Sequence, residues 1–214
     1  MMELSLKSLF FFVYIIINSS CGTDDTTKIT ELKDVEIGDQ IWMKYDLYVN
    51  TFRNGDTIYN AITNKEWEVA GDNKKAAWCF YKIKNNNRLK FGKLYNWYAV
   101  NDPCGLAPKG YHIPSYNEWK KLMKNLGGVY VAGKKMKSIE AWYDSNNESG
   151  FSALPGGSRN YNGFNYVGVF GNWWTSSESG ETHAVYFNLY IGSNILNQGS
   201  DYKSSGYSVR CLKN

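Results

Sequence analysis

The chain has 214 residues and a nearly balanced charge, with 24 lysines and arginines against 20 aspartates and glutamates. This length suits one domain behind a leader, and such a domain buries a full core without depending on metals or many disulfides. The basic residues are scattered in pairs, which argues against a nucleic-acid partner. Aromatic residues make up 16%, including 17 tyrosines and 8 tryptophans. They predict either a core packed with rings or a surface on which sugars or peptides stack.

Residues 1–20 have the features of a signal peptide. The apolar run over residues 9–17 is nine residues long, whereas crossing a membrane takes roughly 20 apolar residues. Small residues stand directly before Cys21, as in the bacterial lipobox. We therefore expect cleavage before Cys21 and lipid attachment to it, with plain secretion as the alternative. Residues 21–31 then form the lipidated cysteine and a polar tether, and residues 32–214 form the folded domain.

The first half of the domain has strand patterns and one weaker helical pattern. Residues 40–44 follow a Gly-Asp turn and predict a strand, and residues 76–81 predict a second one. Apolar residues recur at helical spacing over residues 91–100, which predicts a short amphipathic helix.

The clearest local signal is a capping box. Ser115 is followed three residues later by Glu118, a pairing that predicts the start of a helix. The glycine pair 127–128 predicts its end. Further strands are expected over residues 184–191 and 207–212, with no internal repeat and no second domain.

The stretch 153–178 is the part around which we expect the domain to be organised. It contains a Pro-Gly-Gly corner with Gly156 and Gly157, followed by the adjacent pair Trp173 and Trp174. Glycine is used where φ must be positive or another backbone approaches closely. A buried tryptophan contributes a large apolar area but needs a partner for its indole N–H. We therefore expect a structural role for both glycines within a compact, loop-rich core.

Arg159 and Arg210 flank this aromatic-rich stretch. A guanidinium presents a rigid fork of donors, which suits the bridging of backbone carbonyls or of the Glu178 carboxylate. We expect this structural role for both arginines, with capture of a ligand as the alternative.

The sequence lacks the spacing of the common catalytic and metal-binding motifs. No Gly-x-Ser-x-Gly elbow, phosphate loop or His-Glu-x-x-His occurs. His112 and His183 are the only histidines, and without further ligands at zinc spacing His112 is interpreted as a packed residue. The oxygen-rich loop 144–148 lacks EF-hand spacing, so a solvated loop is favoured over a calcium site. We expect no catalytic residue, no metal and no cofactor.

Several blocks of residues match a known bacterial family in order. The blocks are IGDQIWM (37–43), GKLYNWYAV (92–100), PKGYHIPS (108–115), EW (118–119), LGG (126–128), ESGFSALPGGSR (148–159), WWTSSE (173–178) and YSVRC (207–211). Together they resemble the Fibrobacter succinogenes major paralogous (FISUMP) domain, from about residue 32 to residue 213. The resemblance implies an exported bacterial protein, often a lipoprotein, with no established activity.

A weaker resemblance concerns the architecture. The Gly-Gly-Ser-Arg block and the ending Gly-Tyr-Ser-Val-Arg-Cys are similar to the C-type-lectin-like and formylglycine-generating-enzyme architecture. This resemblance implies an α+β fold: a compact, loop-rich C-type-lectin-like domain with short helices and a small twisted antiparallel sheet.

The resemblance also implies a disulfide. In the family a cysteine near the position of Cys79 often has a partner in the following loop, and residues 85–88 offer none. The pattern then implies a bridge between Cys104 and Cys211, with three buried thiols as the alternative. On the chain-entropy model such a long closed loop stabilises the fold by up to roughly 4–5 kcal/mol.

These observations favour a binding protein over an enzyme. We expect an outer-membrane lipoprotein of the cell envelope, periplasmic or surface-exposed, whose domain binds a glycan, a peptide or an envelope protein. The candidate contacts are Tyr161, Tyr166, Trp173 and Trp174, because aromatic faces beside asparagine amides suit sugar rings. The carbohydrate-binding triplets of calcium-dependent lectins are absent. The alternatives are an oxidase-like enzyme related to the formylglycine generator and a structural component of the envelope.

Overall fold

The computed structural model describes residues 34–81 and 91–214. The expected signal peptide, Cys21 and the polar tether lie outside these residues. Within the part of the chain that is described, no helix is long and apolar enough to cross a membrane.

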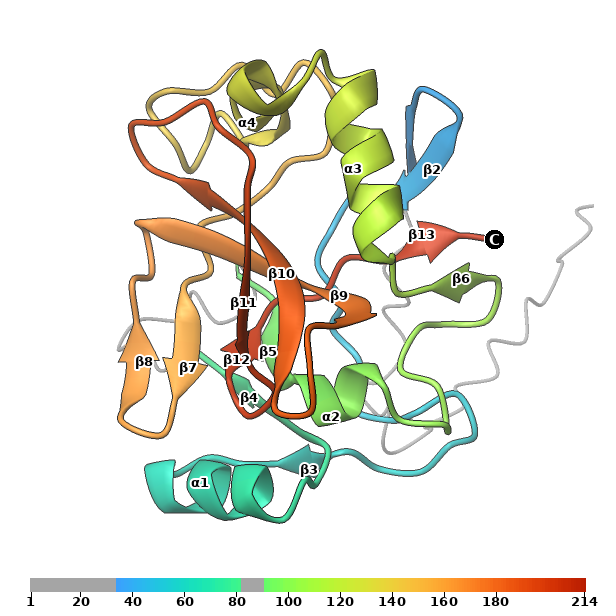
Figure 1. Ribbon diagram of the computed structural model, residues 1–214, viewed down its shortest axis with the longest axis vertical. Coiled ribbons are helices and arrows are strands. Elements are labelled where there is room, and N and C mark those ends of the chain that lie inside the picture. Colours follow the sequence, from blue (N-terminus) through green and yellow to red (C-terminus); the bar gives the residue numbers. More distant parts are fainter. Residues whose placement is uncertain (1–33, 82–90) are drawn as a thin grey trace, which may run out of the picture. The chain divides into compact units, whose positions relative to one another are not determined.

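The described residues form an α+β fold with four short helices and three small sheets (Figure 1). The helices are α1 (Asn64–Asp72), α2 (Trp97–Val100), α3 (Tyr116–Asn125) and α4 (Val129–Met136). The first sheet has the strand order β1 (Asp34–Ile37), β2 (Gln40–Met43), β13 (Leu212–Lys213), β6 (Tyr111–His112). The second has the order β11 (Asn197–Tyr202), β10 (His183–Tyr190), β9 (Phe170–Glu178). The third has the order β3 (Tyr59–Asn60), β4 (Ala77–Phe80), β5 (Lys93–Asn96), β12 (Gly206–Tyr207), β7 (Ser158–Asn160), β8 (Gly163–Asn165).

The α+β class and the short helices agree with the sequence-based expectation, but the single small sheet does not. Three separate sheets form instead, and their strands pair antiparallel except for β3 with β4. The physical reason lies in the strand lengths, because most strands have only two to four residues. Each such strand pairs over a short distance before the chain turns, and aromatic side chains fill the space between the sheets.

The capping box predicted α3 correctly. The Ser115 side chain accepts a hydrogen bond from the Glu118 backbone N–H, and the Glu118 carboxylate accepts one from the Ser115 N–H at 2.7 Å. Gly127 and Gly128 then adopt positive φ angles of 99° and 102° and end the helix. An equivalent box caps α1 through Thr63 and Glu66, a pattern visible in the sequence that our sequence analysis missed.

The expected strands over residues 40–44, 76–81 and 184–191 are confirmed as β2, β4 and β10. The helix expected over residues 91–100 is wrong in its first half. There β5 is the strand that lies between β4 and β12, and all four of its residues are buried. A strand buried on both faces loses the alternation of polar and apolar residues, so its pattern resembled a helix.

The single strand expected over residues 207–212 is also wrong. Tyr207 ends β12 in the third sheet, and Leu212 begins β13 in the first sheet. Residues 208–211 carry the chain from one sheet to the other, so no continuous ladder covers the range.

The adjacent Trp173 and Trp174 divide between two clusters of the core. Successive residues of a strand point to opposite faces, and both side chains are 0% exposed. Trp173 packs against Trp119 and Phe151, with ring centroids 6.1 and 6.2 Å apart. Trp174 packs against Tyr207 on the other side, at 4.5 Å. Because both rings are buried, they are removed from the candidate ligand contacts.

The Pro-Gly-Gly corner requires glycine at Gly157. This residue has a φ of 67°, in the left-handed region that other residues avoid. A Cβ atom there would also lie 2.5 Å from the Asn165 carbonyl oxygen and 2.7 Å from the Val167 nitrogen. Gly156 has no positive φ, but its position against Ser208 leaves little room.

We predict that truncating either tryptophan of β9 destabilises the fold. Trp173→Ala and Trp174→Ala each lose a buried ring and leave a cavity, at a cost of about 3–5 kcal/mol. For a domain of this size such a loss lowers the melting temperature by roughly 10 °C, which thermal unfolding followed by circular dichroism measures. Tyr161→Ala, which removes an exposed ring, is the control and should melt like the wild type. Wild-type melting of both tryptophan variants would contradict their place in the core.

Candidate binding groove

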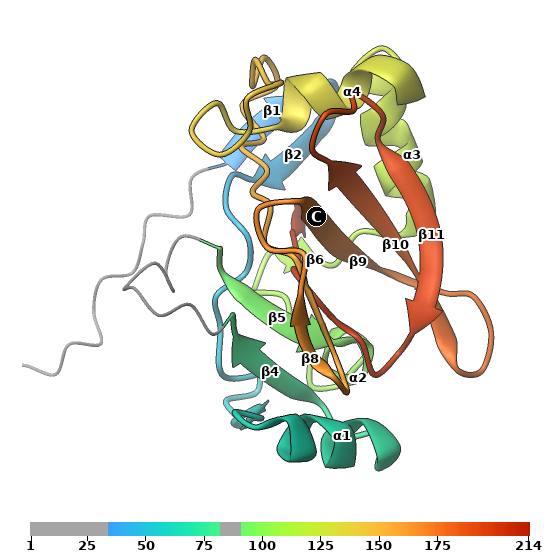
Figure 2. The ribbon, with the colours of Figure 1, turned by 90° about the vertical axis from the view of Figure 1, so that its left-hand side faces the viewer.

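A groove of about 420 Å³ lies between the β7–β8 hairpin, the sheet of β9, β10 and β11, and the chain before β12. In Figure 1 the hairpin lies to the left of β12 and most of β10 to the right, and Figure 2 also shows β8 apart from β10 and β11. The residues that line the groove are mainly tyrosines and asparagines: Tyr161, Tyr166, Tyr186, Tyr202, Tyr207, Asn160, Asn165, Asn172 and Asn188. Among the described residues, no aliphatic side chain lines it.

The outer face of the three-stranded sheet forms the floor of the groove. In the ladder register Asn188 of β10 lies opposite Asn172 of β9 and Asn197 of β11, which places an asparagine on each strand in one row. Next to this row Tyr190 lies opposite Phe170, with ring centroids 4.9 Å apart. Amide groups that can both donate and accept hydrogen bonds thus alternate with aromatic rings on one surface.

On the other side of the asparagine row, the ring of Tyr186 lies over Gly199. A Cβ atom at Gly199 would be 2.9 Å from the Tyr186 hydroxyl, so glycine at this position of β11 leaves room for the ring. Tyr186 packs against Tyr207 at 4.9 Å, and the Tyr207 hydroxyl donates a hydrogen bond to Asp201. Burial, reinforced by the Asp201 charge, raises the pKa of Tyr207 well above its ordinary value. Its phenol therefore stays neutral and keeps its proton for this contact.

The β7–β8 hairpin places two exposed tyrosines beside the groove. Tyr161 lies in the hairpin turn and is 68% exposed, and Tyr166 directly follows β8 and is 63% exposed. The ring of Tyr166 meets that of Phe170 edge-on at 5.5 Å. The two tyrosines are thus brought to one groove, as the sequence analysis expected of ligand contacts, while the two tryptophans are not.

Arg159 lies beneath the groove with a fully buried side chain. Its guanidinium donates to the carbonyl oxygens of Ala61 and Thr63 at 2.9 and 2.7 Å. It is also stacked between the rings of Trp67 and Phe164, at 4.8 and 4.6 Å. The carbonyl and Trp67 contacts tie β7 to the start of α1, and the Phe164 contact ties it to β8; both are structural roles.

The disulfide expected between Cys104 and Cys211 is not formed. All three cysteines of the described chain are free thiols. Cys211 is fully buried in the core, whereas Cys104 is only partly buried and its sulfur lies 3.9 Å from a carboxylate oxygen of Asp56. The two thiols thus have different surroundings and are not joined. The alternative expectation of three buried thiols is right in that all three are free, but Cys104 is only partly buried.

The two histidines have separate local partners. His112 contacts a Glu118 carboxylate oxygen at 2.8 Å and the side-chain oxygen of Asn214 at 2.9 Å. His183 contacts the Thr182 hydroxyl at 2.8 Å and packs against the ring of Tyr202. Within residues 34–81 and 91–214, no cluster of histidine, cysteine, aspartate and glutamate side chains could hold a metal ion.

The carboxylates of the loop 144–148 are paired with lysines. Asp144 contacts the buried Lys137 ammonium at 2.6 Å, and Glu148 contacts Lys135 at 3.0 Å. Lys137 also donates to two backbone carbonyls. The loop is therefore held to α4 and the residue after it, and it is less solvated than the sequence suggested.

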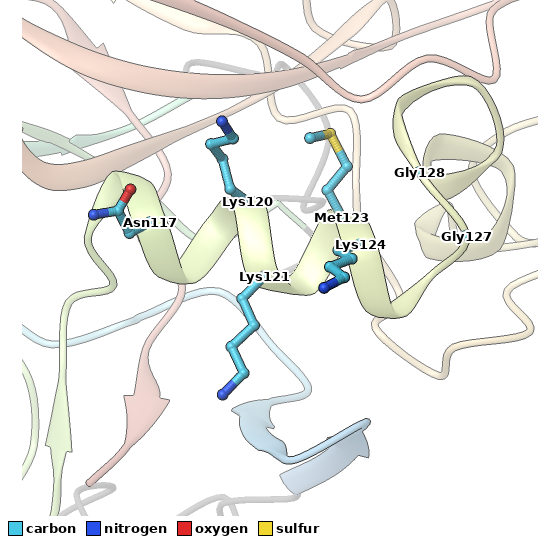
Figure 3. A pocket seen from close by; sticks show the side chains of 7 residues that line it. All are labelled: Asn117, Lys120, Lys121, Met123, Lys124, Gly127 and Gly128. Atoms are coloured by element: carbon cyan, nitrogen blue, oxygen red, sulfur yellow. The ribbon is translucent and has the colours of Figure 1, made fainter.

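A second hollow of about 670 Å³ follows the outer face of α3. Figure 3 shows its side chains diverging, with Lys120 and Lys121 on opposite sides of the helix. Lys121 is already paired with Asp39. Because no set of polar groups converges there, this face is not a candidate site.

The fold and the groove define an α+β domain with an open, tyrosine- and asparagine-lined groove. Residues 35–213 match the model of the family described as the Fibrobacter succinogenes major domain. The chain belongs to this family, which confirms the resemblance noted in the sequence blocks. No curated protein and no solved structure matches the chain.

Most residues of the groove floor were not predicted from the sequence. The sequence does contain a signal for them, because aromatic and asparagine residues recur at every second position of both strands. β9 reads Phe-x-Asn-x-Trp from residue 170, and β10 reads Tyr-x-Asn-x-Tyr from residue 186. Such alternation puts the aromatic and amide side chains of each strand on one face. Only the pairing register brings the two patterns side by side.

We predict that Cys104 is the first of the three described cysteines to react with iodoacetamide in the folded protein. Its side chain is partly exposed, whereas Cys79 and Cys211 are buried. Peptide mapping without reductant should find alkylated Cys104 in the native state and all three alkylated in denaturant. Recovery of a disulfide-linked Cys104–Cys211 peptide would contradict the free-thiol state.

Proposed function

We propose that this chain is an exported bacterial lipoprotein whose domain binds a ligand in the groove and catalyses no reaction. The lipid on Cys21 anchors it to the outer membrane, on the periplasmic or the outer surface. Its ligand is a glycan, a peptide or another envelope protein.

One observation carries the binding proposal: exposed tyrosine rings stand beside a groove that is itself lined by tyrosines and asparagines. Exposing Tyr161 and Tyr166 leaves a large apolar area in water, whereas the eight tryptophans are all buried. Tyrosines contribute a broad contact area and a polar hydroxyl at low entropic cost, and for this reason they are common in binding surfaces.

The cysteine chemistry argues against the oxidase-like alternative. An enzyme related to the formylglycine generator would need reactive thiolates. Burial raises the pKa of Cys79 to about 11 and that of Cys211 to about 12. A hydrogen bond with Asp102 is the main cause that raises the pKa of Cys104. At neutral pH all three are therefore thiols, and the thiol form is a poor nucleophile and metal ligand.

We also propose that the domain has a C-type-lectin-like arrangement. The pairing of the last strand, β13, with β2 near the start of the described chain supports this proposal. So does the placement of α1 and α3 before the long strands β9 and β10. Such an arrangement brings the two ends of the domain together and presents its later strands and loops for binding.

The anchor is tested by Cys21→Ala in the full chain. We expect the wild type in the membrane pellet and the variant in the soluble fraction, because the variant has no thiol to carry the lipid and its remaining apolar run is short. Membrane fractionation with immunoblotting measures the distribution. Equal membrane retention of both proteins would overturn the anchor.

The groove is tested by co-sedimentation of the Cys21→Ala chain, which has no thiol to carry a lipid, with envelope fragments of a producing bacterium that lacks its own copy; the groove variants are made in this background. We expect Tyr161→Ala and Tyr202→Ala to reduce the bound fraction, because each removes an exposed ring that lines the groove. The matched control is Tyr130→Ala on α4, whose ring is exposed outside the groove. If all three variants sediment like the Cys21→Ala chain, the groove is not the binding site and the alternative of a structural envelope component gains support.

A further inference from the structure

The lining of the groove distinguishes among the ligands that the proposed function leaves open. Its apolar surface consists of aromatic rings, without a valine, leucine, isoleucine or methionine among the described lining residues. Peptide-binding grooves usually carry pockets for aliphatic or other side chains. Flat rings instead match the faces of pyranose sugars, where several C–H groups point the same way.

The asparagine row supplies the polar half of such a surface. Asn172 donates its amide N–H to the Gly157 carbonyl oxygen at 3.0 Å, which fixes its orientation. The side-chain oxygen of Asn188 is buried and accepts no hydrogen bond from any described residue. An acceptor left unsatisfied in this way costs free energy until a donor reaches it. Because this oxygen has no exposed surface, a ligand hydroxyl can donate to it only after the Asn188 amide turns toward the groove.

The charges of the groove disfavour an ionic ligand. Among the described residues that line it, only Arg159 and Asp201 are charged. The Arg159 guanidinium is buried and donates through its two terminal nitrogens to backbone carbonyls, while its Nε is buried without a hydrogen-bond partner among the described residues. The Asp201 carboxylate accepts hydrogen bonds from the Tyr207 hydroxyl and from the Tyr202 backbone N–H. Among the described lining residues, no exposed cation is thus available to pair with a carboxylate or sulfate group of an acidic sugar.

The backbone of Tyr166 indicates that its ring is held in place at a cost. Its φ of 61° lies in the left-handed region, where a bulky side chain is a genuine outlier and costs stability. Its carbonyl oxygen accepts hydrogen bonds from the N–H groups of Val169 and Phe170, both at 3.0 Å. Asparagine or glycine would adopt this conformation more easily. Strain of this kind is concentrated at functional sites, and here it positions an exposed ring at the groove.

We propose that the groove binds a neutral oligosaccharide, with sugar faces stacked on the groove tyrosines and sugar hydroxyls bonded to the asparagine row. This inference rests on the proposed function, because it takes the groove as the binding site. Along the strands the lining runs from Tyr186 to Phe170, whose ladder partner Tyr190 lies four residues beyond Tyr186. The floor is therefore about 13 Å long at 3.3 Å per residue of strand. A surface of this length accommodates a short stretch of a glycan chain rather than a single sugar.

The test measures binding of the full chain to immobilised probes by biolayer interferometry. The neutral probes are hexasaccharides of glucose, mannose and xylose in α and β linkage. The acidic probe is a hexamer of galacturonate, and the peptide probes are pools of decapeptides. We expect at least one neutral hexasaccharide to bind, and the galacturonate hexamer not to bind.

Two variants connect the binding to the groove. Tyr166→Asn and Asn188→Ala should each raise the Kd for the neutral probe by about tenfold, the effect of one lost contact of about 1.4 kcal/mol. Tyr130→Ala should leave it unchanged. Tyr166→Asn should at the same time raise the melting temperature by about 2 °C, because asparagine relieves the left-handed strain. A variant that is more stable yet binds more weakly separates loss of the ligand contact from loss of the fold.

The outcomes that overturn the inference are distinct from those that overturn the proposed function. If only the galacturonate hexamer or a peptide pool binds and the two variants abolish that binding, the neutral-glycan assignment is wrong and the groove remains the binding site. If a neutral probe binds equally to the wild type and both variants, the groove assignment is wrong as well. If no probe binds, the inference falls, and the envelope co-sedimentation decides the proposed function separately.

Discussion

The buried ion pair of Arg210 with Asp46 is the contact on which the arrangement of the core depends. The guanidinium lies 2.7 Å from the Asp46 carboxylate and donates to the carbonyl oxygens of Met43 and Phe151. The same carboxylate accepts the indole N–H of Trp173 at 2.8 Å. Four segments far apart in the sequence therefore meet at one charge pair. Removing one partner of such a pair typically lowers the stability of the fold by about 3–5 kcal/mol. The pair therefore couples four segments: the end of β2, the loop at residue 151, β9 and the C-terminal segment.

Around this pair the two large aromatic residue types have different roles. All eight tryptophans are buried, and six of them donate the indole N–H to a backbone carbonyl or to Asp46. Several tyrosines instead reach the surface, including Tyr161, Tyr166 and Tyr202 at the groove. The phenol hydroxyl at the tip of a tyrosine is more easily left in water than the indole N–H within a tryptophan ring. The high aromatic content thus supplies both a packed core and a binding surface.

The sheet of β9, β10 and β11 connects these two roles. Its inner face places Phe187 and Leu189 in the core, where both are fully buried. Its outer face presents Tyr186 and Asn188 of β10 and Asn172 of β9 as the floor of the groove. A floor that is anchored from behind by packed aromatic rings holds its side chains in place before a ligand arrives, which reduces the entropy lost on binding. The groove therefore depends on the same core that the buried ion pair maintains.

The sequence alone predicts the family, the α+β class, the start and end of α3 and the strands β2, β4 and β10. These features depend on local chemistry, such as the contact of Ser115 with Glu118 three residues later, or on residue blocks that are read in order. It also indicated the two hairpin tyrosines. The arrangement in space was needed to show that β5 is a strand, that the tryptophan pair is buried, that the described thiols are free and that asparagines of three strands form one row. Each of these depends on pairing or packing between distant segments, and a one-residue change of register would turn Asn188 to the opposite face.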